Sequence, residues 1–295
     1  MCAARGSPDA GALAAGGDAR QSAGMKDLVA TPILQNRLSF APWADPRTRR
    51  LPGVIPVPYE DWLEVDDAYA AQMGLRDRLI GEACDLVLGL SDHGRPAAEE
   101  LYDLVLPMLP ALGFACSAET VTRPDGAVVA LDRADPLATL GRLLQCDLCL
   151  MEADEAAFGH AEHVLTGGVL CFPSGWTLRE KFMRPMMRIH EPIEIYTDDL
   201  GKRVQRLLDG VREGRGLMRG TASRSAAHLH DPRSEYEFAH APADAPYIRV
   251  ERQCLFRLPR TNAVVFSIHT QVVRPESLSP DQAQSLAEHP IRQAD

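Results

Sequence analysis

The part of the sequence that most restricts the fold lies between residues 247 and 273. Tyr247–Leu258 and Ala263–Val273 are two long runs with many β-branched and aromatic residues, and the four residues PRTN separate them. Two such runs around a short turn cluster predict a β-hairpin. An antiparallel sheet is therefore part of any fold that this chain adopts.

The first of these runs has two different sides, because side chains alternate between the faces of a strand. Arg249, Glu251 and Gln253 share one face with Leu255, while the other face carries Val250, Arg252, Cys254, Phe256 and Leu258. The polar side is either a solvated outer face with an Arg–Glu ion pair or the lining of a cavity that holds a charged ligand. Gln253, in line with the pair, favours the cavity.

The rest of the chain alternates helical and extended patterns. Apolar residues at three- and four-residue steps predict helices at about 61–89, 96–112, 136–144 and 199–213. A turn at Pro124–Gly126 lies between the first strand signals, and the apolar run Val169–Phe172 predicts a buried strand. We therefore expect an α+β fold, with a mostly antiparallel sheet, helices to one side and a helical N-terminal region.

The two ends of the chain differ from its middle. The first 24 residues are almost wholly Ala, Gly, Ser, Asp and Arg, which predicts a disordered tail over residues 1–30. Six prolines between residues 31 and 60 predict an irregular arm that wraps around the domain. Residues 31–275 then form one domain, helical over about 61–113 and built on the sheet over about 118–275, and residues 276–295 form a C-terminal tail.

Composition excludes several classes of protein. The 41 acidic residues exceed the 31 Lys and Arg, and a net charge of −10 disfavours nucleic-acid binding. No apolar run approaches the roughly 20 residues of a membrane span, and no signal-peptide pattern precedes the domain. Seven cysteines, an odd number, indicate a reducing, cytoplasmic setting, and the pair Cys146 and Cys149 is expected to be structural.

The motifs of several enzyme classes are missing from the sequence. There is no GxGxxG, GxxxxGK[ST], GxSxG or HExxH, which removes the familiar dinucleotide-binding, P-loop, serine-hydrolase and zincin interpretations. His160 and His163 could share a metal ion, but the acidic residues around them favour a solvated helix. His228 and His230 lie in a polar loop and are expected to be exposed, while His269 lies on a strand with no evident partner.

His190 has a different setting from the other histidines. It lies between Ile189 and Pro192 in a segment expected to be extended or turned. One interpretation is a structural histidine that is hydrogen-bonded to a carbonyl or carboxylate. The other is an axial haem ligand, which requires a flat apolar pocket and cations for the acidic substituents of haem. Nearby side chains suited to such a pocket are Trp176, Met183, Met186 and Met187.

Four segments carry a resemblance to a known family. They are WLEVDDAYAAQM (62–73), LLQCDLCLM (143–151), GGVLCFPSGWTLREKFMRPMMRIHEPI (167–193) and YIRVERQCLFRLPRTNAVVFSIHT (247–270). The most specific motifs are the FPSxW turn followed by Lys and then IHxP, and the later RxERQxLxRLP strand. Over about residues 31–275 the chain resembles the haem-dependent oxidative N-demethylase family.

The resemblance implies a fold, a cofactor and an activity. The fold would be PAS-like, with a helical N-terminal part, and the cofactor haem b. The activity would be the oxidative removal of a methyl group from a small secondary amine such as dimethylamine, using O2 and releasing formaldehyde. Electrons would come from NAD(P)H through a flavin and iron–sulfur reductase on a separate chain. Whether the subunits form a homo-oligomer stays open.

The resemblance also implies roles for individual residues. His190 would be the proximal haem ligand, and Trp176 would lie in the haem pocket. The candidates for binding the haem propionates are Lys181, Arg249, Arg252 and Arg257, because charge-assisted bonds from cations to carboxylates are strong. Glu251 would be the distal carboxylate that holds the amine and takes up its proton, unless it is only the ion-pair partner of Arg249 or Arg252.

The chain departs from the family pattern at three places. Family members have an Arg followed by Asn-Trp near Met218–Ala222, where this chain lacks the Asn and the Trp. Cys146 and Asp147 replace an acidic pair, and the segment after Arg274 is short and polar. These departures concern the substrate more than the fold. Three alternatives therefore stay open: a haem-PAS gas or redox sensor, a haem-binding protein without turnover, and a haem-free relative. The lack of an output domain favours the enzyme over the sensor.

Overall fold

The computed structural model describes residues 32–49, 53–192, 196–226, 228–234, 237, 241–242 and 244–291, and within them the fold is α+β, as expected. The strands are β1 (Ile55–Val57), β2 (Leu88–Leu90), β3 (Ala115–Cys116), β4 (Thr120–Thr122), β5 (Val128–Ala130), β6 (Asp147–Glu152), β7 (Val164–Val169), β8 (Gly216–Ser225), β9 (Tyr247–Arg257) and β10 (Val264–Val273). A seven-stranded antiparallel sheet has the order β1-β8-β9-β10-β6-β7-β2, and β3-β4-β5 form a small separate sheet.

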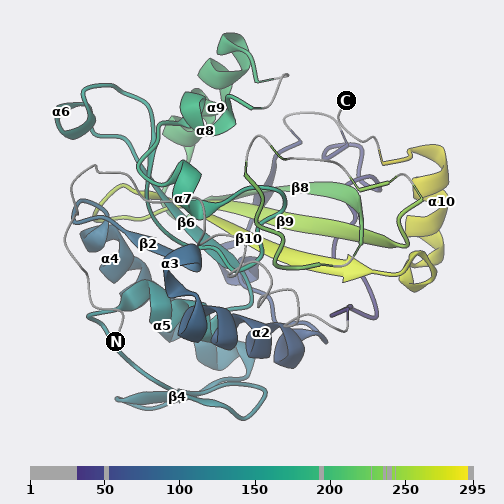
Figure 1. The fold of residues 1–295 in the computed structure, drawn as a ribbon, viewed down its shortest axis with the longest axis horizontal. Helices are drawn as coiled ribbons and strands as arrows, with labels where there is room; N and C mark the ends of the chain where they lie inside the picture. The colour runs from purple at the N-terminus through teal and green to yellow at the C-terminus, as the bar shows by residue number, and fades with distance from the viewer. Residues whose placement is uncertain are drawn as a thin grey trace, which may run out of the picture.

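Helices lie on both sides of the large sheet (Figure 1), so the expectation of helices on one side was wrong. The α-helices are α2 (Tyr69–Glu82), α3 (Cys84–Val87), α4 (Arg95–Val105), α5 (Pro136–Leu143), α6 (Glu155–Phe158), α7 (Leu178–Lys181), α8 (Met186–His190), α9 (Asp198–Gly210) and α10 (Pro280–Glu288). Of these, α2, α4 and α5 pack in the main core, and α7, α8 and α9 pack in a second cluster on the opposite face. Three short 3-10 helices are η1 (Tyr59–Asp61), η2 (Leu106–Leu112) and η3 (Pro275–Ser277). No helix of the described ranges combines the length and the apolar character needed to cross a bilayer.

The two faces of β9 contribute to different hydrophobic clusters. Cys254 and Phe256 point into the main core, which contains the apolar stripes of α2, α4 and α5 and the indole of Trp62. Leu255, on the other face, packs in a second cluster with residues of α7, α8 and α9. We call the side of the sheet that carries Arg249, Glu251, Gln253 and Leu255 the α8 face.

The proline-rich arm covers the end of the sheet opposite to α8. Leu38 and Trp43 pack with Ile248 and Val250 of β9 and with partly buried residues of α10. The Gln35 amide N–H donates to the Val272 carbonyl at 2.9 Å. The arm therefore extends the core and is hydrogen-bonded to the last part of β10.

Most of the predicted elements are confirmed. The hairpin forms from β9 and β10, whose register pairs Arg257 with Val264 and Ile248 with Val273. The turn at Pro124–Gly126 joins β4 and β5, and Gly126 has the positive φ of 85° that such a turn requires. The amphipathic helix predicted at 199–213 is α9.

Some boundaries differ from the prediction for identifiable reasons. The helix expected at 61–89 begins only at Tyr69, because Trp62 and Leu63 are buried in irregular backbone and the Asp66 carboxylate accepts a hydrogen bond from the Ala68 amide at 2.9 Å. That helix ends at Glu82, and residues 88–90 form β2 instead. The second predicted helix is α-helical only to Val105, and a 3-10 helix that contains two prolines follows it.

The strand predicted at Val169–Phe172 lies earlier in the sequence than expected. The strand is β7, which ends at Val169, and the next three residues leave the sheet although they are buried. The carboxylate of Asp147 accepts hydrogen bonds from the amides of Cys171 and Phe172 at 2.7 and 2.9 Å, so these amides have no strand partner. At the C-terminus, residues 276–291 contain α10 with a capping box at Ser279, whereas the predicted tail at 1–30 lies outside the described residues.

Candidate functional site

A row of polar side chains lies on the α8 face. The Arg249 guanidinium is 4% exposed and donates from Nε to the Glu251 carboxylate at 3.1 Å. The same carboxylate accepts a hydrogen bond from the Gln253 amide at 3.1 Å and lies 3.5 Å from the Thr221 hydroxyl. The polar face of β9 is therefore covered by other parts of the protein, and its ion pair does not lie on a solvated outer surface.

Arg219 of β8 extends this row. Its register partner on β9 is Gln253, and the next pair along the two strands on the same face is Thr221 and Glu251. The Nε atom of Arg219 is buried and has no hydrogen-bond partner among the described residues. Burial lowers the pKa of this guanidinium, and the nearby charge of Glu251 opposes that shift. Arg219 is therefore a cation whose charge and hydrogen bonding are only partly satisfied, and it lies beside the Arg249–Glu251 ion pair, in which both charges are paired.

His190 is the last residue of α8, so the expectation of an extended or turned segment was wrong. Its Nδ1 lies 3.0 Å from the Met186 carbonyl oxygen, one helical turn earlier, and its ring stacks on Tyr196 with the centroids 4.2 Å apart. A carbonyl oxygen can only accept a hydrogen bond, so Nδ1 must be the protonated nitrogen that donates to it. Nε2 therefore keeps its lone pair. Burial lowers the pKa of His190, and the charges of Lys181 and Arg219 add to this effect, while the bond to Met186 opposes it. The ring is therefore a neutral imidazole near pH 7.

An apolar cluster lies next to His190 and the polar row, because it contains the neighbouring residues Ile189 of α8 and Leu255 of β9. Ile189 and Leu178 are buried in the second cluster, and Trp176 and Met186 pack against it together with Phe266 of β10. Trp176 thus lies in the same cluster as the helix that carries His190. Of the predicted pocket residues, Trp176 and Met186 pack against this cluster, whereas Met183 is 39% exposed.

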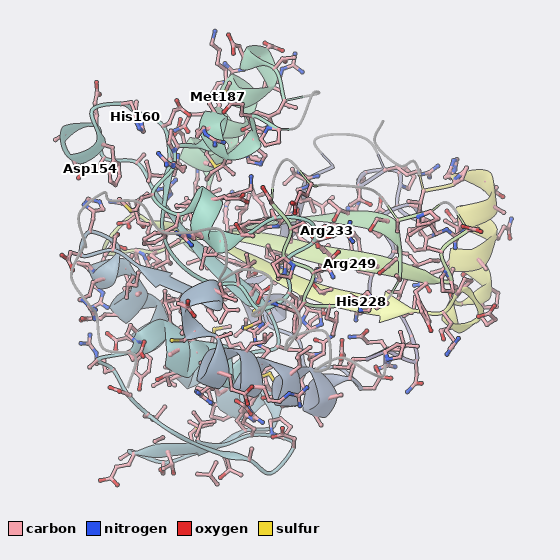
Figure 2. All side chains as sticks on the ribbon, in the orientation of Figure 1. Asp154, His160, Met187, His228, Arg233 and Arg249 are labelled. Atoms are coloured by element: carbon pink, nitrogen blue, oxygen red, sulfur yellow. The ribbon has the colours of Figure 1, made fainter. Side chains whose placement is uncertain are left out.

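The turn that contains the FPSGW sequence is held at this site from three directions. Asp147, which also pairs with the buried Arg76 at 2.6 Å, binds two of its amides. Arg249 donates from Nη2 to the Phe172 carbonyl at 2.7 Å, and the His230 ring binds the Cys171 carbonyl through Nδ1 at 2.8 Å. Figure 2 shows Arg249 over the sheet, close to the segment that carries His228 and Arg233. His230 is half-buried, contrary to the exposed position expected for it, whereas His228 is exposed.

The other predicted propionate-binding cations have partners in the backbone. Arg252 points to the opposite face, where its guanidinium binds the carbonyls of Asp61 and Trp62 at 2.6 and 2.8 Å and the Glu64 carboxylate at 3.2 Å. Arg257 donates to the carbonyls of Leu208 and Val211, both at 2.6 Å, and thereby ties α9 to the sheet. Lys181 donates to the carbonyl of Ile189, beside His190.

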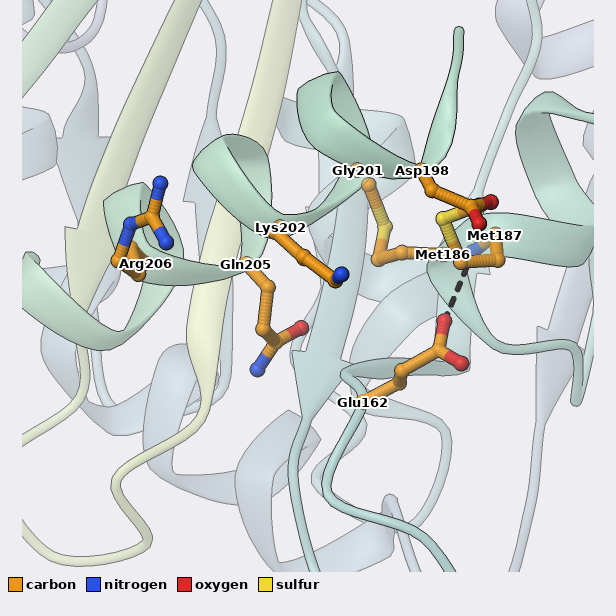
Figure 3. A pocket seen from close by; sticks show the side chains of 8 residues that line it. All are labelled: Glu162, Met186, Met187, Asp198, Gly201, Lys202, Gln205 and Arg206. Atoms are coloured by element: carbon orange, nitrogen blue, oxygen red, sulfur yellow. Dashed lines mark hydrogen bonds between the residues drawn. The ribbon is translucent and has the colours of Figure 1, made fainter.

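A separate cavity of about 380 Å³ lies between α8 and α9 (Figure 3). Its lining includes Met186, Met187, Lys202 and Gln205, and the Met187 amide donates to the Glu162 carboxylate at 2.9 Å. His190 does not line this cavity, so the cavity is distinct from the surroundings of the imidazole ring.

The remaining histidine and cysteine predictions have definite outcomes. His163 is 2% exposed and its Nδ1 lies 2.9 Å from the Gln205 amide, and neither it nor His160 lies on a helix, so the solvated helix was wrong. In the described residues no group of three or more His, Cys, Asp or Glu could hold a metal ion. Cys146 and Cys149 are buried free thiols, and burial raises the pKa of Cys146 to about 12.

Arg219 was the site residue that sequence reasoning missed. The strand β8 has the sequence GLMRGTASRS, whose small and polar residues do not produce a strand pattern. The only available signal was its position at a departure from the family pattern.

Comparison with known proteins shows the family of the chain. A family model described as haem-dependent oxidative N-demethylase, alpha subunit-like, matches residues 53–293. No curated protein matches the chain. Because the match spans well over half of the 295 residues, the chain belongs to the family of haem-dependent oxidative N-demethylase alpha subunit-like proteins.

Proposed function

We propose that this protein is the haem-binding component of an oxidative N-demethylase. Its substrate would be a small methylated secondary amine of the dimethylamine kind, its oxidant O2 and its product formaldehyde. Haem b would be the cofactor, bound in a PAS-like sheet, and the electrons would come from NAD(P)H through a separate flavin and iron–sulfur reductase. The family match supports the class of reaction, and the residues around His190 support the haem.

The observation that carries this proposal is the state of the His190 ring. Its Nδ1 is engaged by the Met186 carbonyl, and its Nε2 has no hydrogen-bond partner in the described part of the chain. Iron-ligating histidines have this arrangement, because a second-shell carbonyl sets the tautomer and the orientation of the ring. The apolar cluster around α8 and the buried Arg219 nitrogen also fit a flat apolar group with acidic substituents. The chemistry of these side chains therefore suits haem: an imidazole for the iron, apolar groups beside it and a guanidinium for a propionate.

When bound, haem supplies the iron at which O2 is reduced, and the protein supplies orientation and proton transfer. His190 would hold the iron from one side, with Tyr196 stacked on its ring to fix the ring plane. Glu251 would accept a proton from the ammonium form of the substrate, which an amine must lose before its N-methyl group is oxidised. Arg249 and Gln253 hold the Glu251 carboxylate in position.

The chemistry balances with the proposed partners. One atom of O2 is inserted into the N-methyl group, and the resulting hydroxymethyl amine releases formaldehyde and the demethylated amine. The other oxygen atom leaves as water, which consumes a pair of electrons and a pair of protons. The reductase supplies the electrons.

The absorption spectrum tests the haem assignment directly. The wild-type protein reconstituted with haem should show a Soret band, and His190→Ala should lose or shift it. His289→Ala, at the C-terminal end of α10, is the matched control and should leave the band unchanged. A colourless wild-type protein, or a His190→Ala variant with the wild-type spectrum, would contradict the proposal.

Turnover distinguishes the enzyme from a haem sensor. Formaldehyde release should be measured with dimethylamine, NADPH and a reductase, first with the wild type and then with Glu251→Gln. We expect product from the wild type and a loss of about a hundredfold or more in Glu251→Gln, since general-base catalysis contributes that much. A haem iron that cycles but yields no product from a panel of methylated amines would show a sensor or a haem-binding protein without turnover.

A further inference from the structure

Arg219 differs from Arg249, Arg252 and Arg257 in its hydrogen-bond partners. Arg249 binds Glu251 and the carbonyls of Phe172 and Leu229, so both its charge and its donors are used. Arg252 and Arg257 are used in the same way on backbone carbonyls. Among these four residues only Arg219 has a buried guanidinium nitrogen that lacks a partner.

A buried donor on a charged group without a partner is costly. Removing a guanidinium N–H from water without giving it an acceptor leaves its desolvation penalty uncompensated. The neighbouring carboxylate of Glu251 compensates for it only in part, because its charge is nearby but its hydrogen bonds are made with Arg249 and Gln253. The row on the α8 face therefore has two arginines and one carboxylate, and its excess positive charge lies at Arg219.

The position of Arg219 relates this excess charge to His190. Arg219 lies on the sheet face that α8 covers, two residues along β8 from Leu217, which packs against the cluster that contains Ile189 of α8. Lys181, the other cation near His190, already donates to the Ile189 carbonyl. An anionic group bound on this face would give the Nε–H of Arg219 the acceptor that it lacks among the described residues.

We infer that Arg219 binds a propionate of the haem. Its Nε–H would then have a hydrogen-bond acceptor only when the cofactor is bound. The inference rests on the proposed function, and it moves the propionate contact from the arginines of β9 to β8. A guanidinium–carboxylate contact provides parallel charge-assisted hydrogen bonds, which suits a propionate at the edge of a porphyrin. Arg219 would then destabilise the empty protein and stabilise the loaded one.

This dual effect is the basis of the test. Arg219→Met removes the charge and the donors but keeps much of the apolar side chain. We expect the haem-free Arg219→Met protein to melt at a higher temperature than the haem-free wild type, because the uncompensated donor is gone. Haem titration followed at the Soret band should show an affinity about ten- to a hundredfold lower than that of the wild type, as expected for a lost charge-assisted bond.

Arg257→Met is the matched comparison. Its guanidinium is hydrogen-bonded to Leu208 and Val211, so the haem-free variant should melt at a lower temperature than the wild type. The affinity of the folded variant for haem should stay within about threefold of the wild type, because no propionate contact is lost. A structural role for Arg219 would make its variant behave like Arg257→Met.

Haem with both propionates esterified supplies an independent readout. Wild-type protein should bind the dimethyl ester more weakly than haem, and Arg219→Met should show little further loss with the ester. The inference is overturned if Arg219→Met lowers the melting temperature of the haem-free protein, or if it binds haem as tightly as the wild type does. The inference is also wrong if the wild type binds no haem. Only that result would show that the proposed function itself is wrong.

Discussion

At the scale of single residues, Asp66 has several hydrogen-bond partners outside the candidate site. Its Oδ2 lies 3.0 Å from His269 Nε2, and it also accepts hydrogen bonds from the amides of Gln145 at 2.6 Å and Gln271 at 3.2 Å. Burial raises the pKa of Asp66, but these hydrogen bonds outweigh it and hold the pKa well below the usual 3.8. His269, for which the sequence shows no partner, therefore has one.

The lowered pKa of Asp66 makes stability depend on pH. A carboxyl group whose pKa is lower in the folded state contributes stability above its unfolded pKa, and this contribution disappears as the pH falls through the folded pKa. At pH 7 we expect Asp66→Asn to lower the free energy of unfolding by about 1–3 kcal/mol. Denaturant unfolding at several pH values should show the difference from the wild type shrinking below about pH 4. A difference that stays constant down to pH 2.5 would contradict this account.

Residue-scale prediction succeeded where a local pattern marks the residue and failed where the partner is distant in sequence. The alternation along Arg249, Glu251 and Gln253 correctly assigned these side chains to one face, and the neighbour of His190 in its motif, Ile189, packs in the cluster on that face. The partner of His269 lies 203 residues away, and no periodicity can indicate such a contact. The same applies to Arg252, whose backbone partners precede it by about 190 residues.

At the scale of elements, the arm at residues 32–49 contacts the sheet through a glycine. A Cβ atom at Gly220 of β8 would come within 2.3 Å of the Phe40 ring and 2.7 Å of Pro42. Both contacts are with the arm, so the absence of a side chain at Gly220 allows the arm to lie on the strand. This close approach is tertiary, and the Pro-rich sequence predicted the arm but not its place.

Gly220→Ala should therefore loosen the arm. We expect it to lower the free energy of unfolding by about 1–3 kcal/mol, the usual cost of an overpacked contact. Gly74→Ala is the control, since a Cβ atom there meets nothing within 4 Å and the residue lies inside α2. That substitution should raise the free energy of unfolding by about 0.5–1 kcal/mol. Equal effects of the two variants in urea unfolding would count against a tight arm contact.

Elements with long regular patterns were predictable, and short or polar ones were not. The hairpin of β9 and β10 and the helix α9 follow from their period, and the structure differs by a few residues at the ends. The strand β8 lacks β-branched and aromatic residues apart from one Thr, so its place between β1 and β9 comes from its neighbours. Val169–Phe172 shows the converse case, because its apolar run indicates burial but not the Asp147 contacts that take it out of the sheet.

At the scale of the whole molecule, the reactivity of the cysteines measures how accessible the core is to solvent. Cys146, Cys149, Cys171 and Cys254 are buried free thiols, and Cys116 is an exposed one. Burial raises the pKa of Cys171 to about 12 and that of Cys254 to about 11, so neither forms a thiolate near pH 7. The four buried thiols come from strands and turns on both sides of the large sheet.

A thiol reagent such as iodoacetamide should therefore modify these five residues unequally. With native protein at pH 7.5 we expect peptide mapping to show rapid modification of Cys116 and at least a hundredfold slower modification of the other four, because thiolate fraction and access both limit the reaction. In denaturant all five should react at similar rates. Fast native modification of Cys149 or Cys254 would show that the sheet opens far more readily than its packing implies.

The alternation along β9 has a consequence for changes in chain length. A substitution at Glu251 alters the α8 face alone, and one at Cys254 alters the main core alone, since each side chain belongs to a single face. Deleting one residue within the strand would instead move every following side chain to the opposite face, placing Phe256 among the polar groups and Arg257 in the core. In a population of related genes, this strand should therefore accumulate point substitutions independently on its two faces, while insertions and deletions collect in the PRTN turn.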